Sequence, residues 1–406
     1  MKQKSKKKQP WLKFRHRVVR VILGPPVHLL CRLKYGIRIQ KFKEEEKRPY
    51  LVLFNHQTPF DQFFVGLAFR TPVYYMASED IFSNGWVSSL IRYLVAPIPI
   101  KKQTTDIKAI LNCIRIAKEG GTIAIAPEGN RTYSGRTEYI NPSIAPLARK
   151  LGLPILLYRI EGGYGAEPRW SNVVRRGKMR SYVSRVIPPE EYAAMTDDEL
   201  VTIIRDGLYI DEACADAEFH HKKSAEYLER AFYVCPDCGL TTFHSRDDTV
   251  ICLTCQKQIR YLPTKKTVGI GFDFPFSFAA EWYDYQKDFI NRLDVLQNTD
   301  EPLYRDRAIL RRVIPYEKKE LLAEDALFSL YGDRITVEGG DETRVFPFDE
   351  VSAVTVLGRN KLNIYHDGNI YQVKGGVRFN ALKYVHIYHR CLNIRKGDPH
   401  EQFLGL

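Results

Sequence analysis

Short apolar runs alternate with amphipathic segments along the first half of the chain. Five of these runs have the length and composition of buried strands: 51–54, 72–76, 96–100, 122–126 and 154–158. Three segments between them space their apolar residues as helices do: 62–68, 105–118 and 143–150. Because strands alternate with helices, this part of the chain predicts an α/β domain with a largely parallel sheet.

The second half of the chain has a different pattern. Two helical stretches within 197–229 lead to a segment with cysteines, and the aromatic-rich stretch at 272–285 is either an interface loop or a packed connector. Short strands separated by turn residues then follow at 327–337, 344–348, 351–356, 361–365 and 370–373. Asp367-Gly368 predicts a hairpin turn, and Asn380 predicts the cap of a last helix. Antiparallel strands closed by one helix resemble the topology of a pleckstrin-homology domain, which would imply lipid or protein docking.

The net charge of +13 lies entirely in the N-terminal arm. Residues 1–50 hold 16 lysines and arginines against 3 acidic residues, whereas the other 356 residues hold 45 of each sign. Apolar residues interleave with these cations from Trp11 to Ile22, which predicts a basic amphipathic helix on a membrane surface with anionic lipid. An arm that binds nucleic acid is the competing interpretation, but the interleaved apolar residues favour lipid.

The apolar run at 21–31 is shorter than the roughly 20 residues that a spanning helix needs, and Pro25-Pro26 interrupts it. The run also lacks the small-residue cleavage site of a signal peptide. We therefore expect a cytoplasmic protein that lies peripherally on the inner face of the cell membrane and has no nucleic-acid partner.

A first polar motif, Asn-His-Gln-Thr-Pro-Phe-Asp, follows the strand at 51–54 and places His56 five residues before Asp61. A neutral histidine can take a proton from an alcohol near neutral pH, and a nearby carboxylate fixes its tautomer. His56 with Asp61 therefore suits general-base activation of a hydroxyl group. The structural alternative is that His56 only caps a turn.

A second polar motif, Ala-Pro-Glu-Gly-Asn-Arg-Thr, follows the strand at 122–126. Arg131 offers a planar group that matches phosphate, and Glu128 could bind a hydroxyl group or hold its loop. The structural alternative is an ordinary ion pair between Glu128 and Arg131. Loops after neighbouring strands are where open α/β sheets build their sites, so the two motifs together favour a functional site.

At these motifs the chain resembles the glycerolipid acyltransferases of the lysophosphatidate acyltransferase type, whose motifs read Asn-His-x-x-x-x-Asp and Phe-Pro-Glu-Gly-Thr-Arg-Ser. The resemblance covers about 50–231. It implies transfer of a fatty acyl group from acyl-CoA or acyl-carrier protein to the hydroxyl of a lysophospholipid, foremost 1-acylglycerol-3-phosphate, in phospholipid biosynthesis. It makes His56 the catalytic base and Asp61 its partner. It also assigns the glycerol phosphate of the acceptor to three residues of the second motif: Glu128, Gly129 and Arg131.

Several positions depart from the family pattern. The segment from Ala96 to Lys102 stands where the family has a motif that opens with Gly and closes with Arg. Lys102 could hold a phosphate as a point charge, without the bidentate grip of arginine. Ala126 and Asn130 replace Phe and Thr, and 153–158 lacks a second proline. The catalytic pair is thus intact while the predicted acceptor site is altered.

Four cysteines form two Cys-x-x-Cys pairs with 13 residues between them: Cys235, Cys238, Cys252 and Cys255. This spacing predicts a zinc ribbon with a structural Zn²⁺ and no open coordination position. Two disulfides are the alternative, which a reducing cytosol disfavours. The other cysteines are expected to be buried free thiols: Cys31, Cys113, Cys214 and Cys391.

The predicted organisation is an arm, an acyltransferase domain, a zinc ribbon, a connector, a β-rich pleckstrin-homology-like domain and a tail, at 1–48, 49–230, 231–265, 266–325, 326–396 and 397–406. An acyltransferase is the leading hypothesis. The alternative is a non-catalytic membrane adaptor that binds lipid or protein, in which the catalytic motifs should be degraded. Both motifs are instead present.

Overall fold

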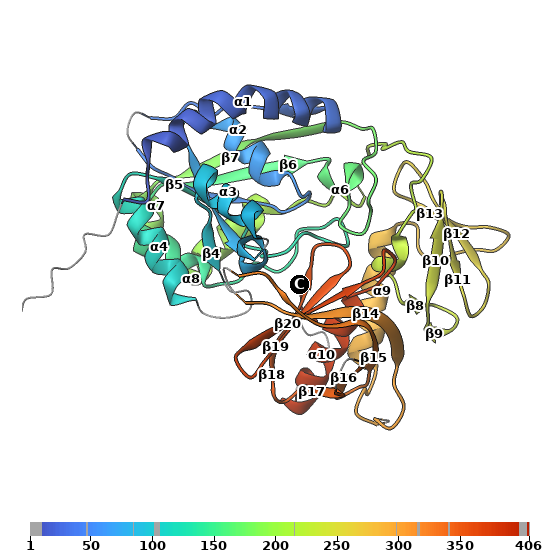
Figure 1. Ribbon diagram of the computed structural model, residues 1–406. Helices are drawn as coiled ribbons and strands as arrows, with labels where there is room; N and C mark the ends of the chain where they lie inside the picture. Colours follow the sequence, from blue (N-terminus) through green and yellow to red (C-terminus); the bar gives the residue numbers. More distant parts are fainter. Residues whose placement is uncertain are drawn as a thin grey trace, which may run out of the picture.

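A seven-stranded mixed sheet forms the centre of the N-terminal domain (Figure 1). The computed structural model describes residues 10–45, 48–83, 85–100, 106–214, 216–297, 299–314, 317–339, 342–397 and 404–405. The strands of this sheet are β1 (Ile37–Ile39), β2 (Leu51–Phe54), β3 (Val73–Ser78), β4 (Ile98–Ile100), β5 (Thr122–Ile125), β6 (Ile155–Glu161) and β7 (Met179–Ile187). Their order is β1-β7-β6-β2-β5-β3-β4, and each described neighbouring pair is parallel except β6 with β7. The predicted α/β domain with a largely parallel sheet is therefore confirmed.

Helices cover both faces of this sheet (Figure 1). They are α1 (Phe14–Tyr35), α2 (Asp61–Ala68), α3 (Trp86–Val95), α4 (Ile107–Lys118), α5 (Ile144–Leu151), α6 (Gly163–Ala166), α7 (Pro189–Ala193) and α8 (Asp197–Leu208). β2 is buried on both sides because its side chains alternate between two cores. Val52 and Phe54 share a core with α1 and α2, whereas Leu51 and Leu53 share one with α4, α5 and α8.

Helix α1 continues through Pro25 and Pro26, so the predicted interruption of this apolar run is wrong. A proline inside a helix costs about 3 kcal/mol, and contacts with the domain offset that cost here. Arg20 donates to the carbonyl oxygen of Phe69 at 2.6 Å, and Cys31 and Tyr35 are buried. Among the described helices, none is both long and apolar enough to cross a membrane.

The cysteine segment folds into small antiparallel sheets. One pairs β8 (Val234–Cys235) with β9 (Gly239–Leu240), and the other joins β10 (Phe243–Arg246), β11 (Thr249–Cys252), β12 (Gln258–Tyr261) and β13 (Thr267–Gly269). Two helical stretches were predicted before this segment. The first is helix α8, whereas the described residues after α8 contain one short 3-10 turn, Leu228–Arg230, and no second α-helix. Cys214 lies in this irregular stretch and is exposed, contrary to prediction, because it belongs to none of the hydrophobic clusters that the described residues form.

A second seven-stranded sheet, entirely antiparallel, forms the C-terminal domain. Its strands are β14 (Tyr304–Arg312), β15 (Glu320–Leu330), β16 (Arg334–Glu338), β17 (Arg344–Pro347), β18 (Val351–Leu357), β19 (Lys361–His366) and β20 (Asn369–Gly375), and its helices are α9 (Ala279–Arg292) and α10 (Leu382–Arg395). The single strand predicted at 327–337 is wrong, because a turn at Gly332-Asp333 divides it between β15 and β16. The hairpin turn at Asp367-Gly368 is confirmed, with φ of 49° and 70°.

The sheet begins inside the predicted connector, since β14 pairs with both β15 and β20. The aromatic stretch packs against the core: the rings of Phe274 and Trp282 lie 5.2 Å apart. Asn380 accepts a hydrogen bond from the backbone N–H of Lys383 at 3.1 Å, as expected of a residue that caps α10.

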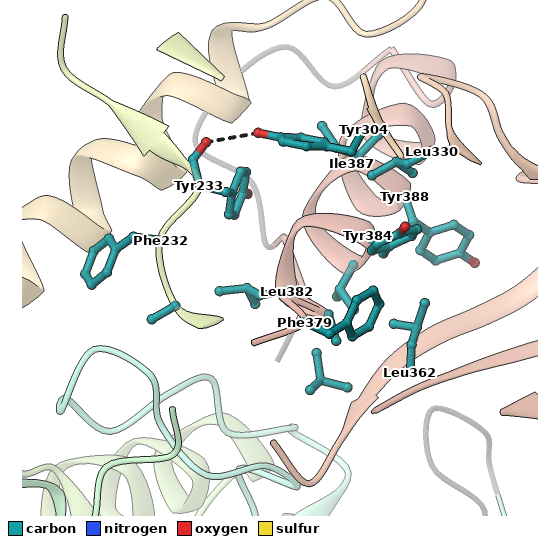
Figure 2. Close-up of a cluster of buried hydrophobic side chains, with 14 of the residues drawn as sticks. Phe232, Tyr233, Tyr304, Leu330, Leu362, Phe379, Leu382, Tyr384, Ile387 and Tyr388 are labelled. Carbon is teal, nitrogen blue, oxygen red and sulfur yellow. Dashed lines mark hydrogen bonds between the residues drawn. The ribbon is translucent and has the colours of Figure 1, made fainter. Parts of the chain in front are cut away.

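One hydrophobic core joins the cysteine segment to the C-terminal domain (Figure 2). Tyr304 of β14 donates a hydrogen bond to the carbonyl oxygen of Tyr233 at 2.9 Å, and Phe232 stacks on Trp282 of α9 with ring centres 3.9 Å apart. In Figure 2, Tyr304 and the side chain of Tyr233 lie on the side towards Tyr384 and Tyr388 of α10, whereas the ring of Phe232 points away from them. The segment therefore cannot unfold without exposing part of the C-terminal core.

Candidate functional site

The two polar motifs lie side by side because their strands are neighbours. β2 and β5 are parallel, with Leu53 opposite Ile125, so the loops that follow them leave the same edge of the sheet. The loops also bond to each other, since the backbone N–H of Thr132 donates to the carbonyl oxygen of His56 at 3.3 Å. The sequence placed each motif after its strand, and the sheet order brings them together.

His56 and Asp61 form a hydrogen-bonded pair. Nδ1 of His56 lies 2.8 Å from Oδ2 of Asp61, and the histidine side chain is 25% exposed whereas the carboxylate is fully buried. Asp61 begins α2 and accepts three further groups: the N–H of Gln57 at 2.6 Å, the N–H of Thr58 at 3.0 Å and the Thr58 hydroxyl at 2.7 Å. These donors fix the position of the carboxylate, which in turn fixes the tautomer of His56 and can stabilise its protonated form. Nε2 is then the ring nitrogen suited to take a proton from a hydroxyl group.

Glu128 holds the two loops together. One carboxylate oxygen accepts the backbone N–H of His56 at 2.8 Å and the other accepts that of Glu138 at 2.8 Å. Burial raises the pKa of Glu128 to about 8, although both backbone donors act in the opposite direction. Of the two roles considered for Glu128, these contacts are those of a residue that holds its loop.

Gly129 forms the turn of the second motif. Its φ is +70°, a backbone conformation that is unfavourable for residues with a Cβ atom. Its N–H donates to the carbonyl oxygen of Ala126 at 3.0 Å. The backbone N–H groups of His56, Gly129 and Thr132 are thus all committed to acceptors within the loops.

Arg131 is buried beside these loops and forms no ion pair with Glu128, which bonds to backbone instead. Its Nη1 is buried without a hydrogen-bond partner among the described residues. Burial, and then the charges of Arg169 and Arg359, lower the pKa of Arg131 to about 10. A buried guanidinium with an unused donor is suited to binding an anion.

Lys102, the second cation expected in the acceptor site, lies outside the described residues. The structure instead brings in cations that the sequence analysis missed. Arg169, from the loop between α6 and β7, donates to the carbonyl oxygen of Arg131 at 2.9 Å, and its Nη2 lies 3.5 Å from Oδ1 of Asn130. No local spacing or motif marks Arg169, because its place depends on how its loop folds back.

The four cysteines predicted to bind metal converge. Their Sγ atoms all lie within 4.8 Å of one another, and those of Cys235 and Cys255 are 3.9 Å apart. Tetrahedral zinc with Zn–S bonds of about 2.3 Å separates its sulfur ligands by about 3.8 Å, so this arrangement fits four thiolates around one ion. Burial opposes ionisation of Cys252, but hydrogen bonds from the N–H groups of Cys255 and Thr254 and from the Thr241 hydroxyl bring the pKa of this thiol below its usual value.

Comparison with known proteins agrees with the chemistry of the paired loops. Residues 37–160 match the model of the Acyltransferase family. A 1-acyl-sn-glycerol-3-phosphate acyltransferase of Bacillus subtilis is 21% identical over 136 residues, which are 34% of this chain and 65% of that protein. This region therefore supports an acyltransferase, although it spans just under two thirds of its curated relative.

Two solved structures are also similar in part. The 1-acyl-sn-glycerophosphate (LPA) acyltransferase of Thermotoga maritima is 20% identical, with a TM-score of 0.40 over 48% of this chain and 80% of that one. The N-terminal PH domain of human ARAP2 is 15% identical, with a TM-score of 0.20 over 24% of this chain and 88% of that one. At these scores neither structure identifies a substrate or partner, and the pleckstrin-homology-like character of the C-terminal domain stays a prediction.

Proposed function

We propose, from the acyltransferase match of residues 37–160 and the geometry of its two loops, that this protein acylates the hydroxyl group of a lysophospholipid. The acceptor is 1-acylglycerol-3-phosphate, and the donor is an acyl thioester of coenzyme A or of acyl-carrier protein. The observation that carries the proposal is the hydrogen-bonded pair of His56 with a fully buried Asp61, next to the buried Arg131. A non-catalytic adaptor has no need of such a pair.

The proposed reaction is a direct transfer. His56 Nε2 takes the proton of the acceptor hydroxyl while Asp61 stabilises the imidazolium that forms. The acceptor oxygen attacks the thioester carbonyl, so a C–O bond forms and the C–S bond breaks. The departing thiolate receives the proton from His56, which returns to its neutral form. Arg131 binds the acceptor phosphate, and Glu128 and Gly129 keep the loop that carries Arg131 in place.

A substrate panel tests this function. Purified protein would be given labelled acyl-CoA or acyl-carrier protein with 1-acylglycerol-3-phosphate, other lysophospholipids, glycerol 3-phosphate and 1-acylglycerol, and the products would be resolved. We expect acylated product mainly from the phosphate-bearing lysolipid. Acylation of phosphate-free acceptors alone would reject this acceptor, and no acylation of any acceptor would favour the adaptor.

We also propose that Cys235, Cys238, Cys252 and Cys255 hold one structural Zn²⁺ as a ribbon. With four thiolate ligands the ion has no position for substrate, so it supports the fold and takes no part in acyl transfer. This agrees with the place of the cysteine segment, whose residues pack into the core of the C-terminal domain.

A further part of the proposal is that α1 and α3 lie on the membrane that holds the acceptor. Large apolar side chains are exposed on both helices: Phe14 (79%), Ile22 (63%), Leu33 (76%) and Trp86 (76%). Arg15 joins the two helices, since its guanidinium lies 4.2 Å from the centre of the Tyr93 ring. Exposed apolar groups beside cations suit an interface with anionic lipid.

Replacement of Trp86 by glutamate should lower binding to vesicles that contain phosphatidylglycerol by about tenfold, since the change removes an apolar anchor and adds a repelled charge. Vesicle co-sedimentation measures the bound fraction. The matched control is Leu321→Glu, because Leu321 is an exposed leucine of the C-terminal domain (46%). Equal binding of Trp86→Glu and the unmodified protein would reject this membrane face.

A further inference from the structure

The turn between β18 and β19 of the C-terminal domain reaches the loop that carries Arg131. The link is Arg169, whose guanidinium donates to the carbonyl oxygens of Val356 at 3.2 Å and Gly358 at 3.4 Å. The same guanidinium donates to the carbonyl oxygen of Arg131. Arg169 is itself buried, so it fixes the turn against the second motif.

Arg359, the residue after Gly358, projects from this turn to the N-terminal domain. Its Nη2 pairs with Glu167, which also accepts the Tyr35 hydroxyl and lies 3.6 Å from Nζ of Lys34. The Nε of Arg359 is buried and has no hydrogen-bond partner among the described residues. The side chain as a whole is 30% exposed, so it lies between protein and solvent.

Positive charge exceeds negative charge at this junction. Arg359 and Lys34 both pair with the carboxylate of Glu167, and the charges of Arg169 and Arg359 both act on Arg131. Asp61 is close enough to act on Arg131 but is already committed to His56 and its loop. Two guanidinium N–H groups, Nη1 of Arg131 and Nε of Arg359, have no acceptor in the described part of the chain. Buried positive charge of this kind is costly unless an anion balances it.

We propose that Arg359 is a substrate-binding residue of the acyltransferase site, and that it binds the phosphomonoester of the acceptor together with Arg131. This inference rests on the proposed function and gives the C-terminal domain a direct part in it. The acceptor subsite is then composite: one guanidinium comes from the motif loop and the other from a turn of the second domain. Two arginines supply the planar donors that Lys102 alone could not supply.

The competing explanation is that Arg359 only clamps the two domains through Glu167. The two explanations make opposite predictions for Glu167→Gln. If Arg359 is a clamp, Glu167→Gln and Arg359→Gln remove the same interaction and should have the same effect. If Arg359 binds phosphate, Glu167→Gln removes a competing carboxylate and should keep or increase the affinity for phosphate.

The experiment measures binding in the full chain with His56→Ala, so that no acyl transfer occurs and the result does not depend on activity. Isothermal titration calorimetry with 1-hexanoylglycerol 3-phosphate, 1-hexanoylglycerol and coenzyme A compares five proteins: His56→Ala alone, and His56→Ala combined with Arg359→Gln, Arg359→Lys, Glu167→Gln or Arg307→Gln. Arg307 is the matched control, an exposed arginine of the same domain in an ordinary ion pair with Asp325. Thermal unfolding of each variant checks that the fold persists.

We expect Arg359→Gln to weaken binding of 1-hexanoylglycerol 3-phosphate by about tenfold or more, the scale of a lost charged hydrogen bond, with binding of 1-hexanoylglycerol unchanged. Arg359→Lys should restore part of the affinity, and Glu167→Gln and Arg307→Gln should not reduce it.

Equal losses in Arg359→Gln and Glu167→Gln would overturn the proposal in favour of the clamp. A loss confined to coenzyme A would assign the anion to the donor, and no loss for any ligand would show that Arg359 binds no substrate. If the binding results are as expected but the substrate panel shows no acylated product, Arg359 is part of an anion-binding site and the proposed acyltransferase function is rejected.

Discussion

Replacement of His56 by alanine should lower kcat for acyl transfer by about 10³-fold or more, because the acceptor hydroxyl loses its general base. The KM values for donor and acceptor should change little, since in the proposed mechanism neither phosphate nor acyl chain is bound by the imidazole. The initial rate with acyl-CoA and 1-acylglycerol-3-phosphate measures the effect. If this variant kept its acyltransferase activity, the assignment of His56 as the general base would be rejected.

The fold should tolerate this change. The imidazole is 25% exposed, and without it Asp61 still accepts hydrogen bonds from Gln57 and Thr58. The buried charge therefore keeps partners, and thermal unfolding should stay near that of the unmodified protein. The matched control is His220→Ala, because His220 is an exposed histidine that also pairs with a carboxylate, Glu218. His220→Ala should keep full activity.

Removal of zinc should have the largest effect on stability. Structural zinc sites contribute about 10–16 kcal/mol of apparent binding free energy in isolated zinc-finger peptides. We expect one Zn²⁺ per chain by elemental analysis, and a marked fall in Tm when a strong chelator extracts it. Because Phe232 and Tyr233 pack on α9 and β14, loss of the ribbon should also loosen the C-terminal core, which near-UV circular dichroism of its buried aromatics would report.

Variants of single cysteines sharpen this test. Cys252→Ser should abolish stoichiometric zinc and lower Tm as chelation does, since Cys252 is fully buried within the cluster. Cys214→Ser is the control, because Cys214 is exposed and lies outside the cluster. A chain that binds no zinc, or one whose Tm is the same with and without zinc, would contradict a structural ribbon.

The proposed composite subsite gives the C-terminal domain a part in binding the acceptor. From sequence, the resemblance of this domain to a pleckstrin-homology topology implied docking of lipid or protein. Its turn is bound by Arg169, and the charge of Arg359 is close enough to act on Arg131. The departures from the family motifs fit this arrangement, since the amide of Asn130, where the family has Thr, lies 3.5 Å from Arg169.

Most strands of the N-terminal domain could be predicted from the sequence, because a buried parallel strand is a continuous run of apolar residues. β14 could not be predicted in the same way. It carries Arg305, Asp306 and Arg307 among few apolar residues, and only its pairing with β15 and β20 makes it a strand. Helix α1 could not be predicted to its full length for the same reason. Local propensity disfavours a helix through two prolines, and contacts with the domain, such as that of Arg20 with the end of α2, stabilise it.

The sequence by itself determined which side chains can do chemistry. His56 and Asp61 are five residues apart in one loop, and the cysteines lie in two short pairs, so local spacing suffices to bring each set together. The tertiary structure alone decided what surrounds Arg131. Arg169 and Arg359 lie far along the chain and in no motif. Arg169 contacts Arg131 because a loop folds back, and the charge of Arg359 acts on Arg131 because a turn of the second domain docks against that loop. Contacts between distant segments follow from packing, which no local pattern of residues records.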